Sequence, residues 1–324
     1  MILSYSLRLI LLCFAFFFLA HATLGLAAWA AGPAVIRFAE RFRPRTAARL
    51  LFALRLLPVG LGMLVLFALC VPSYLRLEPK ASAEQVGLLC VMAAAVGAAL
   101  WIVAGFRALS AAIGSLRFKS QCDRGEMLKS ARKSDGVTVI ETDYPLLALA
   151  GLWQPQVVVS RNVMNALSDE ELSAALKHET VHRTSGDNWK RLLLRATPAV
   201  FPFSRCFARI EQAWLRFSEC AADADATQGE EQASLALASA LIEVARLGTG
   251  RHVPAAVSSL VPDPCDLAER IDRLLIPRPP QSRHQIGTVV VLAATSLFFA
   301  GLATAMLSPS ALIAIHEVLE RLIA

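Results

Sequence analysis

Four long apolar stretches, separated by charged segments, dominate the pattern of hydrophobic and polar positions along this 324-residue chain. Each is close to the roughly 20 apolar residues that a helix needs to cross the hydrocarbon core of a bilayer. They predict membrane-spanning helices at about residues 9–31, 50–71, 86–106 and 287–307, and the third and fourth carry no charge. The sequence therefore predicts a mainly α membrane protein, in which three spans precede a large loop and a fourth span follows it.

The apolar stretches allow two other interpretations. Core helices of a soluble protein are one, but so many uncharged stretches of this length are unusual in such a core. A cleaved signal peptide is the other for the first stretch, because Ala20, His21 and Ala22 resemble a small-residue cleavage site. The apolar run continues past that site to Trp29, however, which favours a retained span.

The segments between the stretches differ in charge, and this difference predicts their orientation. Residues 32–49 contain five arginines and one glutamate, and basic residues also crowd the start of the segment after residue 106. The short segment at residues 72–85 has two basic and two acidic side chains. Because cytoplasmic segments of membrane proteins are enriched in Lys and Arg, we expect residues 32–49 and 107–286 inside a bacterial-type inner membrane and both termini outside.

The composition supports a membrane protein and excludes a disordered one. Hydrophobic residues make up 56% of the chain and charged residues 18%, against about 25% charged in ordinary soluble domains. The formal net charge is +6, and the arginines of the predicted cytoplasmic segments account for it. No recognition helix, zinc finger or RNA-binding motif accompanies this charge, so we expect no direct nucleic-acid partner.

Residues 107–286 are long enough for a domain of their own, and their pattern predicts an α+β fold. Ser168 and Glu171 form an S-x-x-E capping box, which begins a helix. We expect that helix to continue to about Thr184 and to end at Gly186, because glycine suits the left-handed conformation after a helix. The other predicted elements are strands at residues 137–140 and 157–160 and helices from Asn188, from about Ser204 and over Gln232–Leu247.

The helix that begins at the capping box carries the sequence H-E-T-V-H at residues 178–182. Side chains four residues apart lie on one face of a helix, so His178 and His182 can share a tetrahedral metal ion. Glu179 is offset around the helix, where it can act as a base toward water. This H-E-x-x-H arrangement is typical of zinc proteases; the alternative is two histidines and a glutamate on a solvated helix face.

A catalytic zinc ion needs a third protein ligand and one open position. No histidine follows His182 until His252, so we look for a carboxylate on a separate helix. Glu219 and Asp223 share one face of the helix predicted from about Ser204, which suits Glu219 as a ligand and Asp223 as the hydrogen-bond partner of a ligating imidazole. Glu211 is the competing third ligand, but it has no acid four residues further on. An ordinary acidic surface is the remaining alternative.

Further motifs accompany the metal-binding residues. They are Gly151 and Pro155–Ser160 before the metal-binding helix, Arg183 and Asp187-Asn188 after it, Pro202-Phe203, and Glu219 with Asp223. With the arrangement of spans, they resemble the BlaR/MecR-type sensor-transducer family over roughly Thr142 to Arg273. That family consists of membrane gluzincins that inactivate a cytoplasmic repressor. The resemblance implies a cytoplasmic α+β zinc protease domain of the gluzincin type between the third and fourth spans.

The resemblance implies Zn²⁺ bound by His178, His182 and Glu219, with Glu179 as the catalytic base. Zinc would lower the pKa of its bound water toward about 7 and polarise the scissile carbonyl. Glu179 would take the water proton and deliver it to the leaving amine. The candidates for stabilising the oxyanion stay open and are Arg183, Tyr144 and Arg216.

The resemblance also implies where a substrate lies. Residues 155–160, with Val157, Val158 and Val159 at their centre, are expected to form an edge strand along which a peptide lies extended. An exposed strand edge can bind a peptide by main-chain hydrogen bonds. Asp187, just past the metal-binding helix, is expected either to anchor the domain or to cap the loop.

The segment after the fourth span, residues 308–324, departs from the family pattern. Family members that sense beta-lactams carry a penicillin-binding domain there, and these residues contain no S-x-x-K motif. Sensing of beta-lactams by this segment is therefore not expected. Leu312, Ile315 and Leu319 share one helical face, which predicts a short helix lying at the membrane surface.

The sequence thus predicts an integral membrane zinc endopeptidase with a cytoplasmic active site. We expect its substrate to be a protein or peptide, either a transcriptional repressor or the chain itself, and its surroundings to include membrane lipid; a homodimer is left open. One alternative is a quality-control protease of the HtpX type, which shares the ligand motif. The other is a non-catalytic membrane receptor that binds a regulator.

Overall fold

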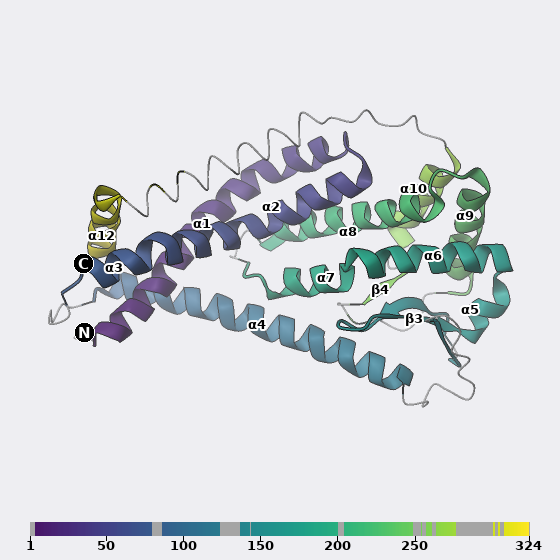
Figure 1. Cartoon of the computed structure of the whole chain (residues 1–324), viewed down its shortest axis with the longest axis horizontal. Coiled ribbons are helices and arrows are strands. Elements are labelled where there is room, and N and C mark those ends of the chain that lie inside the picture. The colour runs from purple at the N-terminus through teal and green to yellow at the C-terminus, as the bar shows by residue number, and fades with distance from the viewer. Residues whose placement is uncertain are drawn as a thin grey trace.

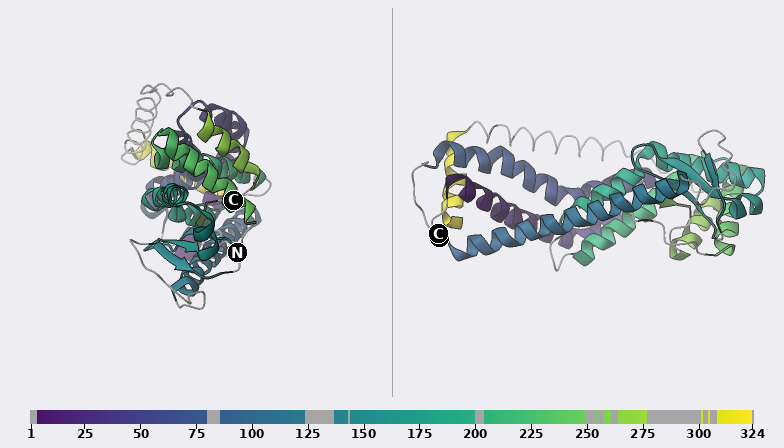
Figure 2. Two further views of the ribbon diagram at one scale, coloured as in Figure 1. Left: turned by 90° about the vertical axis from the view of Figure 1, so that its right-hand side faces the viewer. Right: turned by 90° about the horizontal axis from the view of Figure 1, so that it is seen from below.

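The computed structural model is mainly helical and contains a four-stranded sheet (Figure 1). Long helices run side by side through one end of the molecule, while the sheet and shorter helices lie at the other end, away from both termini (Figures 1 and 2). The residues that the structure describes are 4–79, 86–123, 137–142, 144–199, 204–248, 254, 257–260, 264–276, 301, 304 and 308–323.

Three helical runs are long and apolar enough to cross a membrane. This confirms, by length and composition, the first three predicted spans. The predicted fourth span at residues 287–307 lies outside the described residues, apart from Gly301 and Thr304. The three runs, which we call the bundle, are α1 (Tyr5–Ala39), the continuous run of α2 (Pro44–Val65), the π-helical turn η1 (Leu66–Cys70) and α3 (Val71–Leu77), and α4 (Leu88–Asp123).

The helices of the bundle continue beyond the apolar stretches that predict them. Helix α4 reaches Asp123, although its apolar stretch ends near residue 106. Hydropathy marks where side chains leave apolar surroundings, whereas a helix ends only where its main-chain hydrogen bonds end. The extension carries α4 into the domain, where Ala111 and Ala112 pack in a cluster with Leu192 of α7 (Asp187–Ala196).

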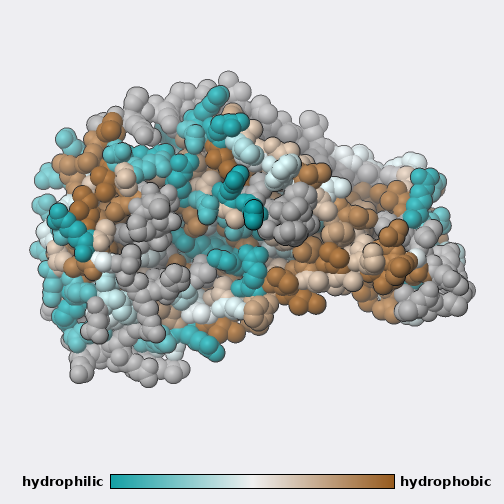
Figure 3. All heavy atoms as spheres, turned by 180° about the vertical axis from the view of Figure 1, so that it is seen from behind, coloured by the Kyte–Doolittle hydropathy of each residue, from teal (hydrophilic) through white to brown (hydrophobic). Residues whose placement is uncertain are grey.

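Close packing and apolar surface characterise the bundle. A Cβ atom added to Gly97 of α4 would lie 2.4 Å from the main-chain oxygen of Phe14 in α1, so this helix crossing depends on glycine. Seen from behind, hydrophobic side chains cover much of the bundle and hydrophilic ones gather over the opposite end (Figure 3). Leu89, Ile102 and Phe106 of α4 are exposed, as expected for a surface that faces lipid.

The C-terminal helix α12 (Pro309–Ile323) packs against the bundle. Leu312 and Leu319 are buried, and Ser73 Oγ of α3 donates a hydrogen bond of 2.7 Å to the main-chain oxygen of Leu312. The predicted apolar face therefore covers protein. The predicted helix is confirmed, and its apolar face packs on the bundle; its place at the membrane surface stays a prediction.

The domain that follows α4 contains the sheet, with strand order β1-β3-β2-β4. Strand β3 is parallel to β1 and antiparallel to β2. The sequence predicts β1 and β3, but not β2, whose four buried residues show no alternation of apolar and polar side chains. The strands are β1 (Val137–Ile140), β2 (Leu147–Ala150), β3 (Gln156–Ser160) and β4 (Ser258–Ser259).

Strand β3 lies inside the sheet, which corrects the expected edge strand. Its main chain pairs with β1 on one side and with β2 on the other, and Val157, Val158 and Val159 are buried. A strand that is paired on both sides has no free edge to offer a peptide. The expectation that these three valines bind an extended substrate is therefore wrong.

Helices pack against the sheet and complete the domain. Helix α6 (Asp169–Ser185) begins with the predicted capping box between Ser168 and Glu171 and ends at Gly186, whose φ is 68°. Both helix signals of the sequence are thus confirmed, as are the three helices predicted after α6. The remaining helices are α5 (Arg161–Ala166), α7, α8 (Ser204–Thr227), α9 (Glu231–Arg246) and α10 (Pro264–Leu275).

Helix α8 contacts both ends of the molecule, since it packs along α2 and also against α6. Two ion pairs join it to α2. In the first, Arg55 Nε of α2 lies 2.8 Å from Glu211 Oε1, and the arginine side chain is 1% exposed. In the second, Arg45 Nη1 lies 3.0 Å from Asp225 Oδ2 at the surface. Glu211, the competing metal ligand of the sequence, is therefore bound to Arg55.

Because one ion pair is buried and the other is exposed, we expect variants of the two arginines to differ strongly in stability. Arg55→Gln leaves the Glu211 carboxylate largely buried without its cation, and the loss of one partner of a buried pair costs about 3–5 kcal/mol. Arg45→Gln removes an exposed pair, which is worth about 0–1 kcal/mol. We expect the denaturant midpoint, followed by circular dichroism in detergent, to fall strongly for Arg55→Gln and little for Arg45→Gln.

A double variant tests the cause of that loss. Arg55→Met combined with Glu211→Leu leaves no buried charge, so it should recover most of the stability that Arg55→Gln loses. A midpoint for Arg55→Gln equal to that of the wild type, or a double variant no more stable than the single one, would contradict the role of the pair.

Candidate metal centre

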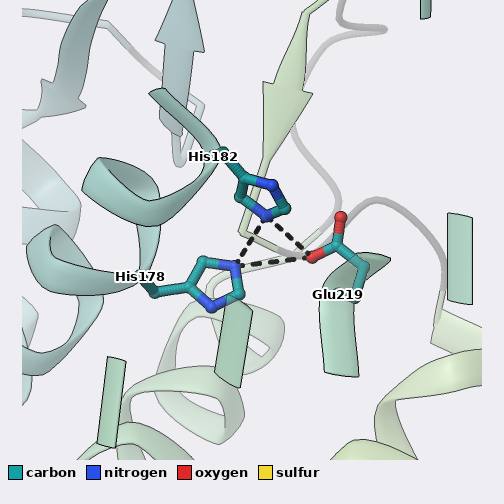
Figure 4. A group of neighbouring side chains, drawn as sticks. All are labelled: His178, His182 and Glu219. Atoms are coloured by element: carbon teal, nitrogen blue, oxygen red, sulfur yellow. Dashed lines mark hydrogen bonds and ion pairs between the residues drawn. The ribbon is translucent and has the colours of Figure 1, made fainter. Parts of the chain in front are cut away.

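His178 and His182 of α6 point toward Glu219 of α8, and all three side chains are buried (Figure 4). The distance between the two Nε2 atoms is 3.1 Å, and Glu219 Oε2 lies 3.4 Å from His178 Nε2 and 3.5 Å from His182 Nε2. Ligand atoms about 2.0–2.1 Å from a tetrahedral zinc ion are separated by roughly 3.3–3.4 Å. The triangle therefore has the size of one face of a zinc coordination tetrahedron.

The outer nitrogens of both rings face carboxylates. His178 Nδ1 lies 2.9 Å from Asp223 Oδ1, and His182 Nδ1 lies 2.7 Å from Asp187 Oδ2. A neutral imidazole that donates from Nδ1 has a lone pair on Nε2. Two such lone pairs and Glu219 Oε2, which accepts no hydrogen bond in the described structure, thus converge on one point. This donor set fits a cation with nitrogen and oxygen ligands, and Zn²⁺ takes such sets.

The two outer carboxylates are themselves held in place. Arg270 of α10 donates from Nε and Nη2 to the two oxygens of Asp223 at 2.8 and 2.7 Å. Asp187 accepts hydrogen bonds from Lys190 Nζ at 2.7 Å and from Ser218 Oγ at 3.0 Å. Carboxylates behind ligating histidines orient the rings and raise their basicity, so these contacts keep the metal-facing nitrogens in position.

Two arginines contact Glu219, the third candidate ligand. Arg191 Nη2 of α7 lies 3.3 Å from Glu219 Oε1, and Arg270 Nη1 lies 3.4 Å from Glu219 Oε2. Burial alone would raise the pKa of Glu219, but the nearby His182, His178 and Arg270 outweigh it and hold that pKa well below the usual range. Glu219 is therefore ionised at neutral pH, as a metal ligand must be.

The surroundings of the histidines favour positive charge. Burial opposes the charged form of His182, but the Glu219 carboxylate and the hydrogen bond to Asp187 outweigh it and raise its pKa to about 10. The same carboxylates that stabilise a proton on the ring can stabilise a metal cation in its place. The charges around the histidines and the distances between their nitrogens therefore both favour a cation at this point.

Glu179 lies between the two candidate ligand histidines in sequence and is fully buried. Burial raises the pKa of Glu179, and neither of its carboxylate oxygens has a hydrogen-bond partner within the described ranges. Such a carboxylate is free to accept a proton from water and to release it again. The arrangement can therefore support metal-assisted hydrolysis.

Of the residues that the sequence singles out, the structure brings five into one cluster. His178, His182 and Glu219 form the triangle, Asp223 contacts His178, and Glu179 lies in the same helical turn. Val157, Val158 and Val159 lie in the interior of the sheet instead. Of the oxyanion candidates, Arg216 is engaged by Glu40 and Glu269, Tyr144 packs in a core cluster, and Arg183 is exposed.

Sequence reasoning missed the roles of Arg270, Arg191 and Asn188 and left that of Asp187 undecided. Asn188 Nδ2 donates to the main-chain oxygens of Leu149 and Gly151, both at 2.8 Å, and so ties α7 to β2. Arg270 lies far along the chain from Asp223, and no spacing pattern connects them. The position of Asp187 directly after the H-E-x-x-H helix is a sequence feature that could have indicated its contact with His182.

We expect the two outer carboxylates, Asp187 and Asp223, to strengthen zinc binding. Asp223→Asn and Asp187→Asn each remove the charge behind a ligating imidazole, so we expect zinc affinity to fall about 10- to 100-fold. Competition titration of the purified protein with a fluorescent zinc chelator measures this. Asp225→Asn, two residues further along α8 at the surface, is the matched control and should bind zinc like the wild type. Equal affinities for all four proteins would contradict the assignment.

The chain matches a known protein family. Residues 72–274 match the family model described as BlaR1 peptidase M56. This stretch covers more than half of the chain and includes α6 and α8, which carry the candidate metal ligands. No curated protein matches the chain.

Proposed function

The chain belongs to the BlaR1 peptidase M56 family, and on that premise we propose that it is an integral membrane zinc endopeptidase that acts in signalling. The observation that carries the proposal is the buried convergence of His178, His182 and Glu219 in a triangle of zinc dimensions. The carboxylates behind both rings support it, because they complete the donor set that catalytic zinc sites use. This intact set favours an enzyme over a non-catalytic receptor.

His178, His182 and Glu219 would hold the ion. When bound, Zn²⁺ supplies a Lewis acid that polarises a peptide carbonyl and lowers the pKa of water. Glu179 accepts the proton of the attacking water and delivers it to the leaving amine. Asp187 and Asp223 keep the rings oriented throughout.

We place the domain on the cytoplasmic side. The five arginines in residues 32–49, which lie in the last turn of α1, in the connection and at the start of α2, support this orientation under the positive-inside rule. A fourth span at residues 287–307 would then return the chain to the outside. The substrate that this placement favours is a cytoplasmic protein, such as a transcriptional repressor, or the chain itself.

Glu179→Gln tests the proposed base directly. The variant keeps the three ligand side chains, so it should retain about one zinc ion per chain while cleavage falls about 10²- to 10⁴-fold, the usual contribution of a general base. Mass spectrometry of a peptide library incubated with the protein in nanodiscs measures cleavage, and metal analysis measures zinc. Glu170→Gln, an exposed glutamate at the start of the same helix, is the control and should cleave normally.

Removal of the metal provides a second arm of this test. Dialysis against a zinc chelator should abolish cleavage in the wild type, and added zinc should restore it, because ligand and metal together form the site. Cleavage by Glu179→Gln at the wild-type rate, or cleavage that survives complete loss of zinc, would refute the proposed function.

A further inference from the structure

A cavity of about 290 Å³ lies among α2, α6, α7 and α8, beside the metal centre. Asp187 lines it, whereas none of the three candidate metal ligands does. The rings of Phe52 and Trp214, whose centroids are 5.8 Å apart, form an apolar part of its wall. The cavity therefore adjoins the candidate metal centre and shares Asp187 with it, but it contains none of the three candidate ligands.

The polar lining of this cavity is suited to an anion. Arg45 and Arg49 reach it from one face of α2, and Lys190 reaches it from α7. The two acids that line it are already engaged: Asp225 by Arg45, and Asp187 by Lys190, Ser218 and His182. Arg49 has no acidic partner in the part of the chain that the structure describes. Its guanidinium is thus available to a ligand, and the lining carries more positive than negative charge.

The position of the cavity along α2 indicates the source of the anion. Arg49 directly precedes the apolar stretch that begins near residue 50, and further along the same helix Leu57 is 44% exposed. A charged pocket at the end of an apolar span lies where lipid phosphates lie, and basic pockets of this kind bind anionic headgroups. The exposed apolar surface beyond it can carry acyl chains.

We propose that this cavity binds the phosphate headgroup of an anionic glycerophospholipid, with Arg49 as the principal contact and Arg45 and Lys190 completing the site. An arginine guanidinium matches a phosphate by two parallel hydrogen bonds. This lipid would belong to the inner leaflet of the membrane, which rests on the proposed cytoplasmic placement of the domain. Because Lys190 also binds Asp187, the partner of His182, the headgroup would lie directly behind the metal centre.

Matched arginine variants test the proposal in the full-length protein. Native mass spectrometry compares retention of phosphatidylglycerol and of phosphatidylcholine with equal acyl chains. We expect the wild type to prefer phosphatidylglycerol and Arg49→Gln to lose about tenfold or more of that affinity, the range for hydrogen bonds to charged groups. Arg41→Gln removes an equal charge from the α1–α2 connection outside the cavity, so at high salt, where surface attraction is screened, it should bind like the wild type.

Two results would overturn the proposal. Equal losses in Arg49→Gln and Arg41→Gln would show general surface attraction, and displacement of phosphatidylglycerol by inorganic phosphate at comparable concentration would show a free-anion site. Both arginines are exposed, and circular dichroism checks that the variants fold. Because lipid retention requires no cleavage, it can be measured in Glu179→Gln as well, so failure here leaves the peptidase proposal untouched, and failure of cleavage leaves the lipid test intact.

Discussion

The candidate metal centre depends on the contacts between two carboxylates and the outer nitrogens of two histidines, because these contacts fix how the rings are oriented. With His178 Nδ1 facing Asp223 and His182 Nδ1 facing Asp187, both Nε2 lone pairs turn toward Glu219 Oε2 at 3.1 to 3.5 Å. Three electron-rich atoms this close repel one another unless a proton or a metal cation lies among them. The arginines and the lysine around this cluster stabilise its carboxylates, so the surrounding residues maintain an arrangement whose stability requires positive charge at the centre.

Helix α8 extends the consequences of this arrangement to the membrane spans. It carries Glu219 and Asp223 in its second half, and about 12 Å away along the same helix axis it carries Glu211, which pairs with the buried Arg55 of α2. The candidate metal centre is therefore assembled from α6 on one side and, on the other, from α8, which packs on a candidate membrane span. The spans position half of the site and do more than attach a separate domain to the bilayer.

The features that the sequence predicts correctly are local ones. The capping box at Ser168, the i to i+4 histidines and the face shared by Glu219 and Asp223 all follow from helix geometry within one or two turns. Strand β3 is interior because it pairs with both β1 and β2. Since β2 is buried throughout and does not alternate apolar and polar side chains, the sequence pattern does not predict this strand. Arg270 reaches Asp223 through tertiary folding from α10, and α12 finds a protein surface for its apolar face. Such contacts join segments that are distant in sequence, so the spacing of residues along the chain does not predict them.

X-ray absorption at the zinc edge of the purified full-length protein tests most directly the proposal that three side chains hold one zinc ion. We expect about one zinc ion per chain with nitrogen and oxygen neighbours at about 2.0–2.2 Å, two of them imidazoles. Glu219→Ala should lower the occupancy and remove an oxygen neighbour. Sulfur neighbours at about 2.3 Å, or a wild-type protein that binds no zinc, would contradict the central claim.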